Sequence, residues 1–210
     1  CHGKLCTDKR KDILELRKCV GIVFQDPDRQ IIASTVEGEI SFGLFPLGKS
    51  EEEIRQLTGK IMERMQLAHL ADRPPHFLSG GEKKQVSIAS VAVMKPEVLL
   101  FDEPTASLDW KNTVLFKEQL KQLEQERVTL MISTHDMDFV WEWAERVLVF
   151  SEGELLADDV PEVIFGNQTL LEQASLRQPF LYLLPGHPKT IEAWKETEGK
   201  RKEANREENQ

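Results

Sequence analysis

Two short apolar segments with a helical stretch between them constrain the fold more than any other feature of the sequence. The segments EVLLF (97–101) and VTLMIS (128–133) are apolar in near-continuous runs, which is typical of strands buried on both faces. Between them, LFKEQLKQLEQE (115–126) has the pattern of a helix. A strand, a helix and a second strand predict a β-α-β unit, so we expect an α/β fold with a parallel sheet.

The rest of the chain adds strands and helices around this unit. VGIVF (20–24) predicts another strand, and a mostly helical stretch follows to about residue 95. RVLVF followed by SEGELL predicts a strand and a hairpin, after which PEVIFGNQTLLEQASLRQPF predicts short helices. From about Lys189 the chain is charged and nearly without apolar residues, so we expect that end to be frayed or disordered.

Composition excludes several classes of protein. A chain of 210 residues that is 40% hydrophobic can form one substantial core. Its net charge of −9 argues against nucleic acid or an anionic membrane as the main partner, since both attract basic surfaces. No apolar run approaches the length of a membrane span, so a role at a membrane requires docking on another protein.

The three cysteines, Cys1, Cys6 and Cys19, lie near the start of a chain without a visible secretory signal. We therefore expect reduced thiols, as in a cytosolic protein. CHGKLC lacks a second pair of ligands at the spacing of a zinc site, which disfavours a metal there. The sequence opens on cysteine and not methionine, as a fragment of a longer protein would.

The segment GLFPLGKS (43–50) fits the phosphate-binding pattern G-x-x-x-x-G-K-[ST]. Its surroundings disagree, because the preceding TVEGEISF carries two glutamates where a buried strand should be apolar. Ser50 and Glu53 instead have the spacing of a capping box, and three glutamates crowd the helix start that a phosphate would need. We interpret the segment as a loop that caps an amphipathic helix.

Two acids, Asp102 and Glu103, end a buried strand in VLLFDEPTASLD. Ligands bind at the carboxyl ends of parallel strands in α/β proteins, and successive residues leave a strand on opposite faces. A buried, uncompensated acid pair would be costly unless a metal or proton chemistry used it. One of these acids could hold Mg²⁺ while the other meets a water molecule.

LSGGEKKQ (78–85) combines a helix cap with two glycines. Ser79 and Glu82 have capping-box spacing, which explains them without any ligand. Gly80 and Gly81 would leave the N–H groups of the first helical turn open to an anion such as a phosphate. Both interpretations stand at this point.

Two further polar residues follow predicted strands. His135 in MISTHD could hydrogen-bond a phosphate oxygen or a water molecule, although a lone histidine there is more often a packing residue. Gln25 after VGIVF could reach a metal ion or only cap a turn.

Taken in chain order, Gln25, LSGGE, LLFDEP, SLD and STHD resemble the ATPase domain of ABC transporters over about residues 20–155. The resemblance implies a P-loop NTPase-type parallel sheet core with a helical subdomain. It makes Gln25 the Q-loop glutamine and Asp102 the Walker B aspartate, both near Mg²⁺. It also gives roles to the remaining motifs: Ser79, Gly80, Gly81 and Glu82 as the signature, Glu103 as catalytic base, Asp109 as the D-loop aspartate and His135 as the switch histidine.

A narrower resemblance, to the ATPases of energy-coupling-factor importers including the cobalt and nickel group, rests on three stretches. They are LRKCVGIVFQDPDRQIIASTVEGEISFG, AERVLVFSEGELLADDVPEVI and LLEQASLRQPF. In this family the P-loop precedes the Q-loop, so GLFPLGKS lies on the wrong side of Gln25 to be it. We therefore expect the P-loop and first core strands to lie ahead of residue 1. Gln85 and Trp110 also depart from the usual residues without affecting the assignment.

The resemblance implies an ATP-binding and ATP-hydrolysing subunit that energises import of cobalt or nickel ions or of water-soluble vitamins. ATP and Mg²⁺ are the implied cofactors. The implied partners are a second ATPase subunit, a transmembrane coupling subunit and a substrate-binding membrane subunit, which place the protein peripherally on the cytoplasmic face of the cell membrane. Without a P-loop, the chain alone is expected to be inactive.

Two alternatives remain open. The chain could be a catalytically inactive partner that donates only its signature motif to an intact ATPase. A soluble ABC protein of translation or DNA repair fits less well, because those usually have paired cassettes or long coiled coils.

The expected domains are a core remnant up to the Q-loop (1–30), a helical subdomain (31–95), the ATPase core (96–160), a helical extension (161–188) and a charged tail (189–210).

Overall fold

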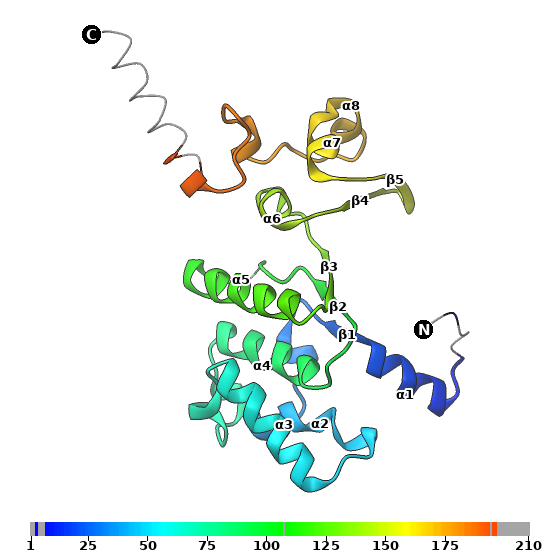
Figure 1. Ribbon diagram of the computed structural model, residues 1–210, viewed down its shortest axis with the longest axis vertical. Coiled ribbons are helices and arrows are strands. Elements are labelled where there is room, and N and C mark those ends of the chain that lie inside the picture. The colour runs from blue at the N-terminus through cyan, green and yellow to red at the C-terminus, as the bar shows by residue number, and fades with distance from the viewer. Residues whose placement is uncertain (1–2, 4–6, 107, 194, 197–210) are drawn as a thin grey trace. The chain divides into compact units, whose positions relative to one another are not determined.

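The fold is described by a computed structural model covering residues 3, 7–106, 108–193 and 195–196 (Figure 1). It divides the chain into two compact units, residues 1–133 and 134–210. Each unit has its own arrangement of helices and strands and is described separately.

The first unit is built on a parallel sheet of three strands in the order β1-β2-β3. These strands are β1 (Val20–Val23), β2 (Val98–Asp102) and β3 (Thr129–Ser133). Helix α5 (Trp110–Gln125) connects β2 to β3, and the two strands pair in parallel. The β-α-β unit predicted from the apolar segments is confirmed, because runs of Val, Leu and Ile favour buried strands.

Register brings the carboxyl ends of the three strands to one edge of the sheet. Val23 lies opposite Phe101 in the β1–β2 pair, and Asp102 lies opposite Ser133 in the β2–β3 pair. The last residues of these strands are therefore neighbours although they are far apart in sequence.

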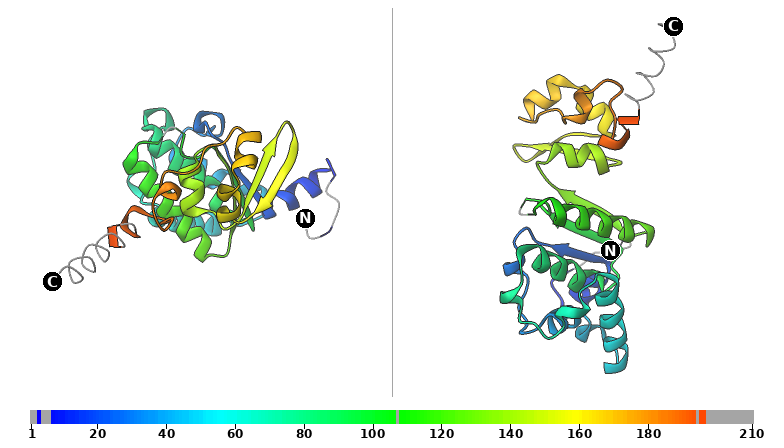
Figure 2. Two further views of the ribbon diagram at one scale, coloured as in Figure 1. Left: turned by 90° about the horizontal axis from the view of Figure 1, so that it is seen from above. Right: turned by 90° about the vertical axis from the view of Figure 1, so that its left-hand side faces the viewer.

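The predicted helical stretch is also confirmed. Helix α4 packs against both β1 and α2, and α2 contacts α3 (Figure 2). The helices are α2 (Val36–Phe42), α3 (Glu51–Arg64) and α4 (Gly80–Ala92), with single 3₁₀ turns at Pro27–Arg29, Phe45–Leu47, Ala68–Leu70 and Pro75–Phe77.

The start of the chain differs from expectation in two respects. A helix not predicted from the sequence, α1 (Arg10–Cys19), precedes β1. Cys19 at its end is disulfide-bonded, so the expectation of a reduced thiol is wrong for this residue. Cys1 and Cys6 lie outside the described residues.

The second unit contains the predicted hairpin. Strands β4 (Val147–Ser151) and β5 (Glu154–Asp159) pair antiparallel. Glu152 and Gly153 between them both have positive φ, 49° and 82°, as a two-residue hairpin turn of type I′ requires. The helices are α6 (Met137–Trp143), α7 (Pro161–Gly166) and α8 (Gln168–Gln173), followed by a 3₁₀ turn at Leu181–Leu183.

Trp141 is the centre of a small core in this unit. It packs edge-on against Phe165 and Tyr182, and its indole Nε1 donates to the carbonyl oxygen of Pro188 at 2.8 Å. Lys189 lies 3.5 Å above the indole ring and its Nζ is 2.7 Å from Glu162. The expected fraying is therefore wrong at Lys189 itself, while residues 194 and 197–210 of the predicted charged tail lie outside the described residues.

Candidate functional site

The first group of predicted site residues gathers at the carboxyl edge of the parallel sheet. Gln25 follows the end of β1, while Asp102 ends β2 and Glu103 follows it. Ser133, the last residue of β3, donates its hydroxyl to Oδ1 of Asp102 at 2.8 Å. Sequence reasoning placed Gln25 and the two acids here. It quoted Ser133 within STHD but gave it no role of its own.

Glu103 has an uncommon backbone conformation. Its φ is +40°, in the left-handed region that residues other than glycine seldom adopt. Its N–H donates to the carbonyl oxygen of Ser133 at 2.9 Å, which holds the strained residue in place. Strain of this kind is concentrated at functional sites, where the surrounding structure maintains it.

The two acids are less buried than expected. Asp102 is exposed and Glu103 is partly exposed, so the argument that an uncompensated buried pair would be costly does not apply to them. Exposed carboxylates at a strand end suit Mg²⁺, which usually takes one or two protein carboxylates and completes its shell with water and phosphate oxygens. Asp102, with one oxygen held by Ser133, fits that role, and the exposed Gln25 fits a second oxygen donor.

The start of helix α4 has the expected capping box. The hydroxyl oxygen of Ser79 accepts from the N–H of Glu82 at 3.3 Å, and Oε2 of Glu82 accepts from the N–H of Ser79 at 2.7 Å. These hydrogen bonds lower the pKa of the Glu82 carboxyl, and the positive charges of Arg73 and His69 lower it further. Two basic residues therefore lie near this helix start, which the sequence pattern did not indicate.

The two glycines of the motif differ in their surroundings. Gly80 is exposed, and a Cβ added there would meet nothing within 4 Å. Gly81 is buried, and a Cβ there would lie 2.3 Å from the side chain of Asn112 in α5. Gly80 thus leaves the helix start uncovered, whereas Gly81 permits close packing of α4 on α5.

Asp109 caps helix α5. Its Oδ1 accepts from the backbone N–H of Asn112 at 2.8 Å and from the carboxamide Nδ2 of Asn112 at 2.9 Å. Asn112 therefore links the aspartate of SLD to Gly81 of LSGGE. Sequence reasoning missed Asn112, because only the packing of α4 on α5 brings it to the motif.

Lys84 is a further residue that sequence reasoning missed. It is buried in α4, and its Nζ donates to the carbonyl oxygens of Phe24 at 2.9 Å and Gln25 at 3.2 Å. Burial lowers the pKa of Lys84 to about 8, and the carboxylates of Asp102 and Asp26 oppose that shift. Lys84 therefore lies near Asp102 as well as the Gln25 backbone.

His135 belongs to the second unit. It is exposed and lies between the end of β3 and α6, one residue before Asp136, which caps α6. The other predicted site residues belong to the first unit.

The segment GLFPLGKS forms a helix cap, as predicted. The preceding TVEGEISF is not a strand but mostly helix α2, and Gly48 adopts a left-handed φ of 71°. Ser50 and Glu53 form a capping box at the start of α3. The strand, turn and helix that a phosphate-binding loop requires are therefore not formed here.

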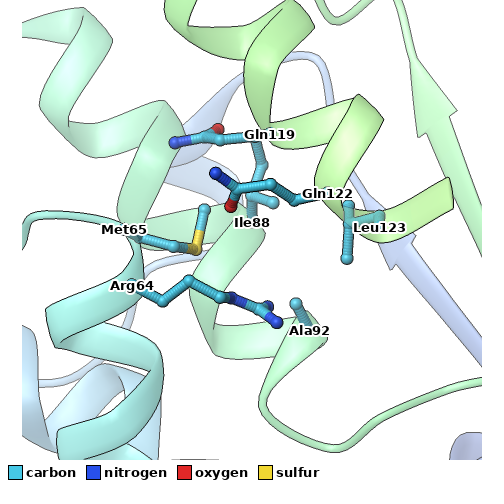
Figure 3. Close-up of a pocket in the computed structure, with 7 residues that line it drawn as sticks. All are labelled: Arg64, Met65, Ile88, Ala92, Gln119, Gln122 and Leu123. Carbon is cyan, nitrogen blue, oxygen red and sulfur yellow. The ribbon is translucent and has the colours of Figure 1, made fainter. Parts of the chain in front are cut away.

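A pocket between α3, α4 and α5 includes none of the predicted site residues (Figure 3). Arg64 reaches across it from α3, and its guanidinium pairs with Glu126 at the end of α5. The contact joins the end of α3 to the end of α5. The lining residues are Arg64, Met65, Ile88, Ala92, Gln119, Gln122 and Leu123.

Comparison with known families accounts for this set of motifs. The profile of the ABC transporter family matches residues 2–106. The chain belongs to the ABC transporter family. Among relatives of that family, a putative ABC transporter ATP-binding protein of Methanosarcina acetivorans is 44% identical over 81% of this chain and 52% of its own length. The energy-coupling factor transporter ATP-binding protein EcfA of Methanothermobacter thermautotrophicus is 41% identical over 84% of this chain and 57% of its own length.

A solved ABC transporter structure has the same fold. It is that of cbiO1 from Clostridium perfringens, described as part of the ABC transporter complex cbiONQ, with a TM-score of 0.69 and 38% identity. The match covers 83% of this chain and 70% of that one. This likeness confirms the predicted P-loop NTPase-type α/β fold and the resemblance to energy-coupling-factor ATPases. The chain spans about half the length of the curated relatives that it matches.

Proposed function

We propose that this chain is the ATP-binding, ATP-hydrolysing subunit of an ABC importer of the energy-coupling-factor type. The transported substrate would be cobalt or nickel ions or a water-soluble vitamin. The observation that carries the proposal is the meeting of Gln25, Asp102 and Glu103 at one edge of the sheet, in a chain of this family. The names of two relatives, EcfA and cbiO1, support the importer group.

Each residue at the sheet edge has a role in this proposal. Asp102 and Gln25 would hold Mg²⁺, and Glu103 would orient or deprotonate the attacking water molecule. Bound Mg²⁺ neutralises negative charge on the β- and γ-phosphates of ATP. His135 would donate a hydrogen bond to the γ-phosphate. Catalysis would then depend on positioning and electrostatics, as is usual in phosphoryl transfer.

The signature residues would act on a second ATPase subunit. Ser79 and the open N–H groups beside Gly80 would face the phosphates of a nucleotide held by that subunit, with Glu82 completing the cap. Asp109 would lie at the contact between the two subunits. Closure of the pair would drive transport.

Membrane attachment would be indirect. Among the residues that the structure describes, no helix is both long and apolar enough to cross a bilayer. We propose a peripheral position on the cytoplasmic face of the cell membrane, held by a transmembrane coupling subunit that works with a substrate-binding membrane subunit.

The alternative is an inactive partner that donates its signature motif alone. The presence of both Glu103 and His135 favours the hydrolysing subunit, since a donor of the signature needs neither.

Hydrolysis in a version of the chain that carries the family's P-loop ahead of residue 1 tests the proposal. That version should hydrolyse ATP in the presence of Mg²⁺, and Glu103→Gln should lower turnover by about two orders of magnitude while ATP binding remains. The amide keeps the shape of the carboxylate and loses its basicity. Near-normal hydrolysis by the variant would show that another residue is the base, and no hydrolysis by the parent would favour the inactive partner.

A further inference from the structure

A buried lysine connects helix α4 to the loop that bears Gln25. Lys84 is 4% exposed, and lysines are rarely so buried without partners. Its partners are the carbonyl oxygens of Phe24 and Gln25, at 2.9 and 3.2 Å from Nζ. Its ammonium thus fixes the backbone at the point where the chain leaves β1.

A glutamine attaches the same loop to α4 a few residues later. Nε2 of Gln30 donates to the carbonyl oxygen of Ser87 at 2.7 Å and to the hydroxyl of Ser90 at 3.2 Å. Its Oε1 accepts from the N–H of Phe24 at 3.2 Å. The loop is therefore joined to itself and to α4 through one side chain.

A buried carboxylate holds the end of the loop. Glu39 in α2 is 4% exposed, and its Oε2 accepts from the N–H groups of Ile32 and Ala33, both at 2.8 Å. Helix α2 in turn packs against α4. Lys84, Gln30 and Glu39 thus join residues 24–33 to α4 and α2, and α4 also packs against β1.

We propose that Lys84 is a positioning residue that holds the backbone of the Gln25 loop to helix α4 and so fixes Gln25 for its role. This rests on the proposed function, in which Gln25 helps to hold Mg²⁺ and α4 bears the signature. Lys84 itself touches neither nucleotide nor metal in this role, since both of its hydrogen bonds go to the backbone.

Hydrogen exchange on the 210-residue chain tests the attachment without any nucleotide. Lys84→Met keeps the apolar stem and removes both hydrogen bonds, so amides of residues 24–30 should exchange about tenfold faster or more, the size expected for losing a charge-assisted hydrogen bond. Amides of β2 and β3 should keep their rates. Lys84→Arg, which retains a cationic donor, should restore much of the protection.

Lys83 provides the matched control. It is the adjacent lysine of α4, and its Nζ contacts the same loop through the exposed carboxylate of Asp28 at 2.7 Å. Exposed ion pairs contribute little, so Lys83→Met should leave exchange at 24–30 near that of the parent. If Lys84→Met fails to fold, Gln30→Met removes the neighbouring attachment and should give the same local increase. Equal acceleration in β2, β3 and the loop, or none in the loop, would overturn the proposal.

A kinetic measurement separates positioning from stability. In the version that carries a P-loop, Lys84→Met should lower kcat at least tenfold and raise the Mg²⁺ concentration needed for half-maximal rate, with the KM for ATP little changed. Lys83→Met should change none of these. A parent that does not hydrolyse ATP contradicts the proposed function alone, because the exchange result stands without it. Normal kcat and Mg²⁺ dependence in Lys84→Met contradict the positioning role.

Discussion

The two adjacent glycines of the LSGGE motif have different surroundings, so the absence of a side chain has a different effect at each position. Gly80 is at the open start of α4, where an added methyl group meets no other atom within 4 Å. Gly81 lies against the Asn112 carboxamide, which Asp109 holds through a 2.9 Å hydrogen bond. A side chain at 81 would therefore have to displace a restrained neighbour, while one at 80 would only cover open N–H groups.

We expect Gly81→Ala to lower the free energy of unfolding by about 1–3 kcal/mol, the usual cost of overpacking. Gly80→Ala should change it by less than about 0.5 kcal/mol, as a substitution without new contacts does. Urea titration of both variants measures the difference. Combining Gly81→Ala with Asn112→Ala should recover part of the loss, and equal stability of the two single variants would contradict this account.

At the scale of single residues, the sequence predicts what depends on neighbours along the chain. The capping box of Ser79 and Glu82 was predictable because both partners lie within one turn. The burial of Lys84 was not, because composition places lysines on the surface and only the fold supplies two carbonyl oxygens as partners. The exposure of Asp102 was also missed, since a preceding apolar run says nothing about what lies beyond the strand end.

Helix α3 provides a prediction about a whole element. Ser50 caps it, accepting from the N–H of Glu53 at 3.3 Å while the Glu53 carboxylate accepts from the N–H of Ser50 at 2.8 Å. Ser50→Ala should therefore lower the free energy of unfolding by about 1 kcal/mol. Lys49→Ala, one residue away, should not lower it measurably, which urea titration of both variants would check.

The same variants test whether 43–50 binds phosphate. Calorimetric titration of the chain with ATP should give no binding that depends on Lys49, because Glu51, Glu52 and Glu53 fill the first turn of α3 and repel a phosphate. Micromolar binding that Lys49→Ala abolishes would show that this segment is a working phosphate site.

The β4–β5 hairpin contains a pH-sensitive ion pair. Nε and Nη2 of Arg146 each lie 2.6 Å from an oxygen of Asp158, and this pairing lowers the pKa of the Asp158 carboxyl. The resulting stability is present above the pKa of an unfolded aspartate, about 3.9. It is lost as the pH falls through the lowered pKa of the folded state.

We therefore expect Asp158→Asn to lower the melting temperature slightly at pH 7 and to have a smaller effect near pH 2. Glu154→Gln in the same strand, for which the structure gives no such pair, is the matched control. If Asp158→Asn lowers the melting temperature equally at both pH values, the loss of stability does not come from this ion pair.

Elements were predictable where burial left a pattern. The strands β2 and β3 were found because near-continuous apolar runs have few alternatives. Helix α1 was not, and its apolar side chains Ile13 and Leu16 are still 37% and 39% exposed, so no fully buried face marked it. Helix α2 was predicted only as part of a longer helical stretch. It is seven residues long, and its buried Glu39 resembles a surface residue in the sequence, so its own bounds left no pattern.

On the scale of the whole molecule, the loop after β1 combines a fixed backbone with an exposed surface. Its carbonyls and amides are held by α4 and α2, as described above, whereas the side chain of Arg29 is 81% exposed and Ile32 is 68% exposed. Ile31 between them is partly buried, so a substitution there would disturb the fold as well as the exposed surface. A rigid loop that presents a cation and an apolar side chain is suited to contact a protein partner in the proposed transporter.

We expect Arg29→Glu combined with Ile32→Asp to release the chain from membranes that contain its transmembrane partner. Both changes lie on exposed side chains, so the melting temperature should stay near that of the parent. Leu183→Asp is the matched control, because Leu183 is 63% exposed and belongs to the second unit. Co-sedimentation with partner-containing vesicles and with protein-free anionic vesicles measures the effect. The net charge of −9 opposes direct attachment to anionic lipid. Binding to protein-free vesicles, or release by Leu183→Asp but not by the double variant, would therefore show that the chain does not dock through this loop.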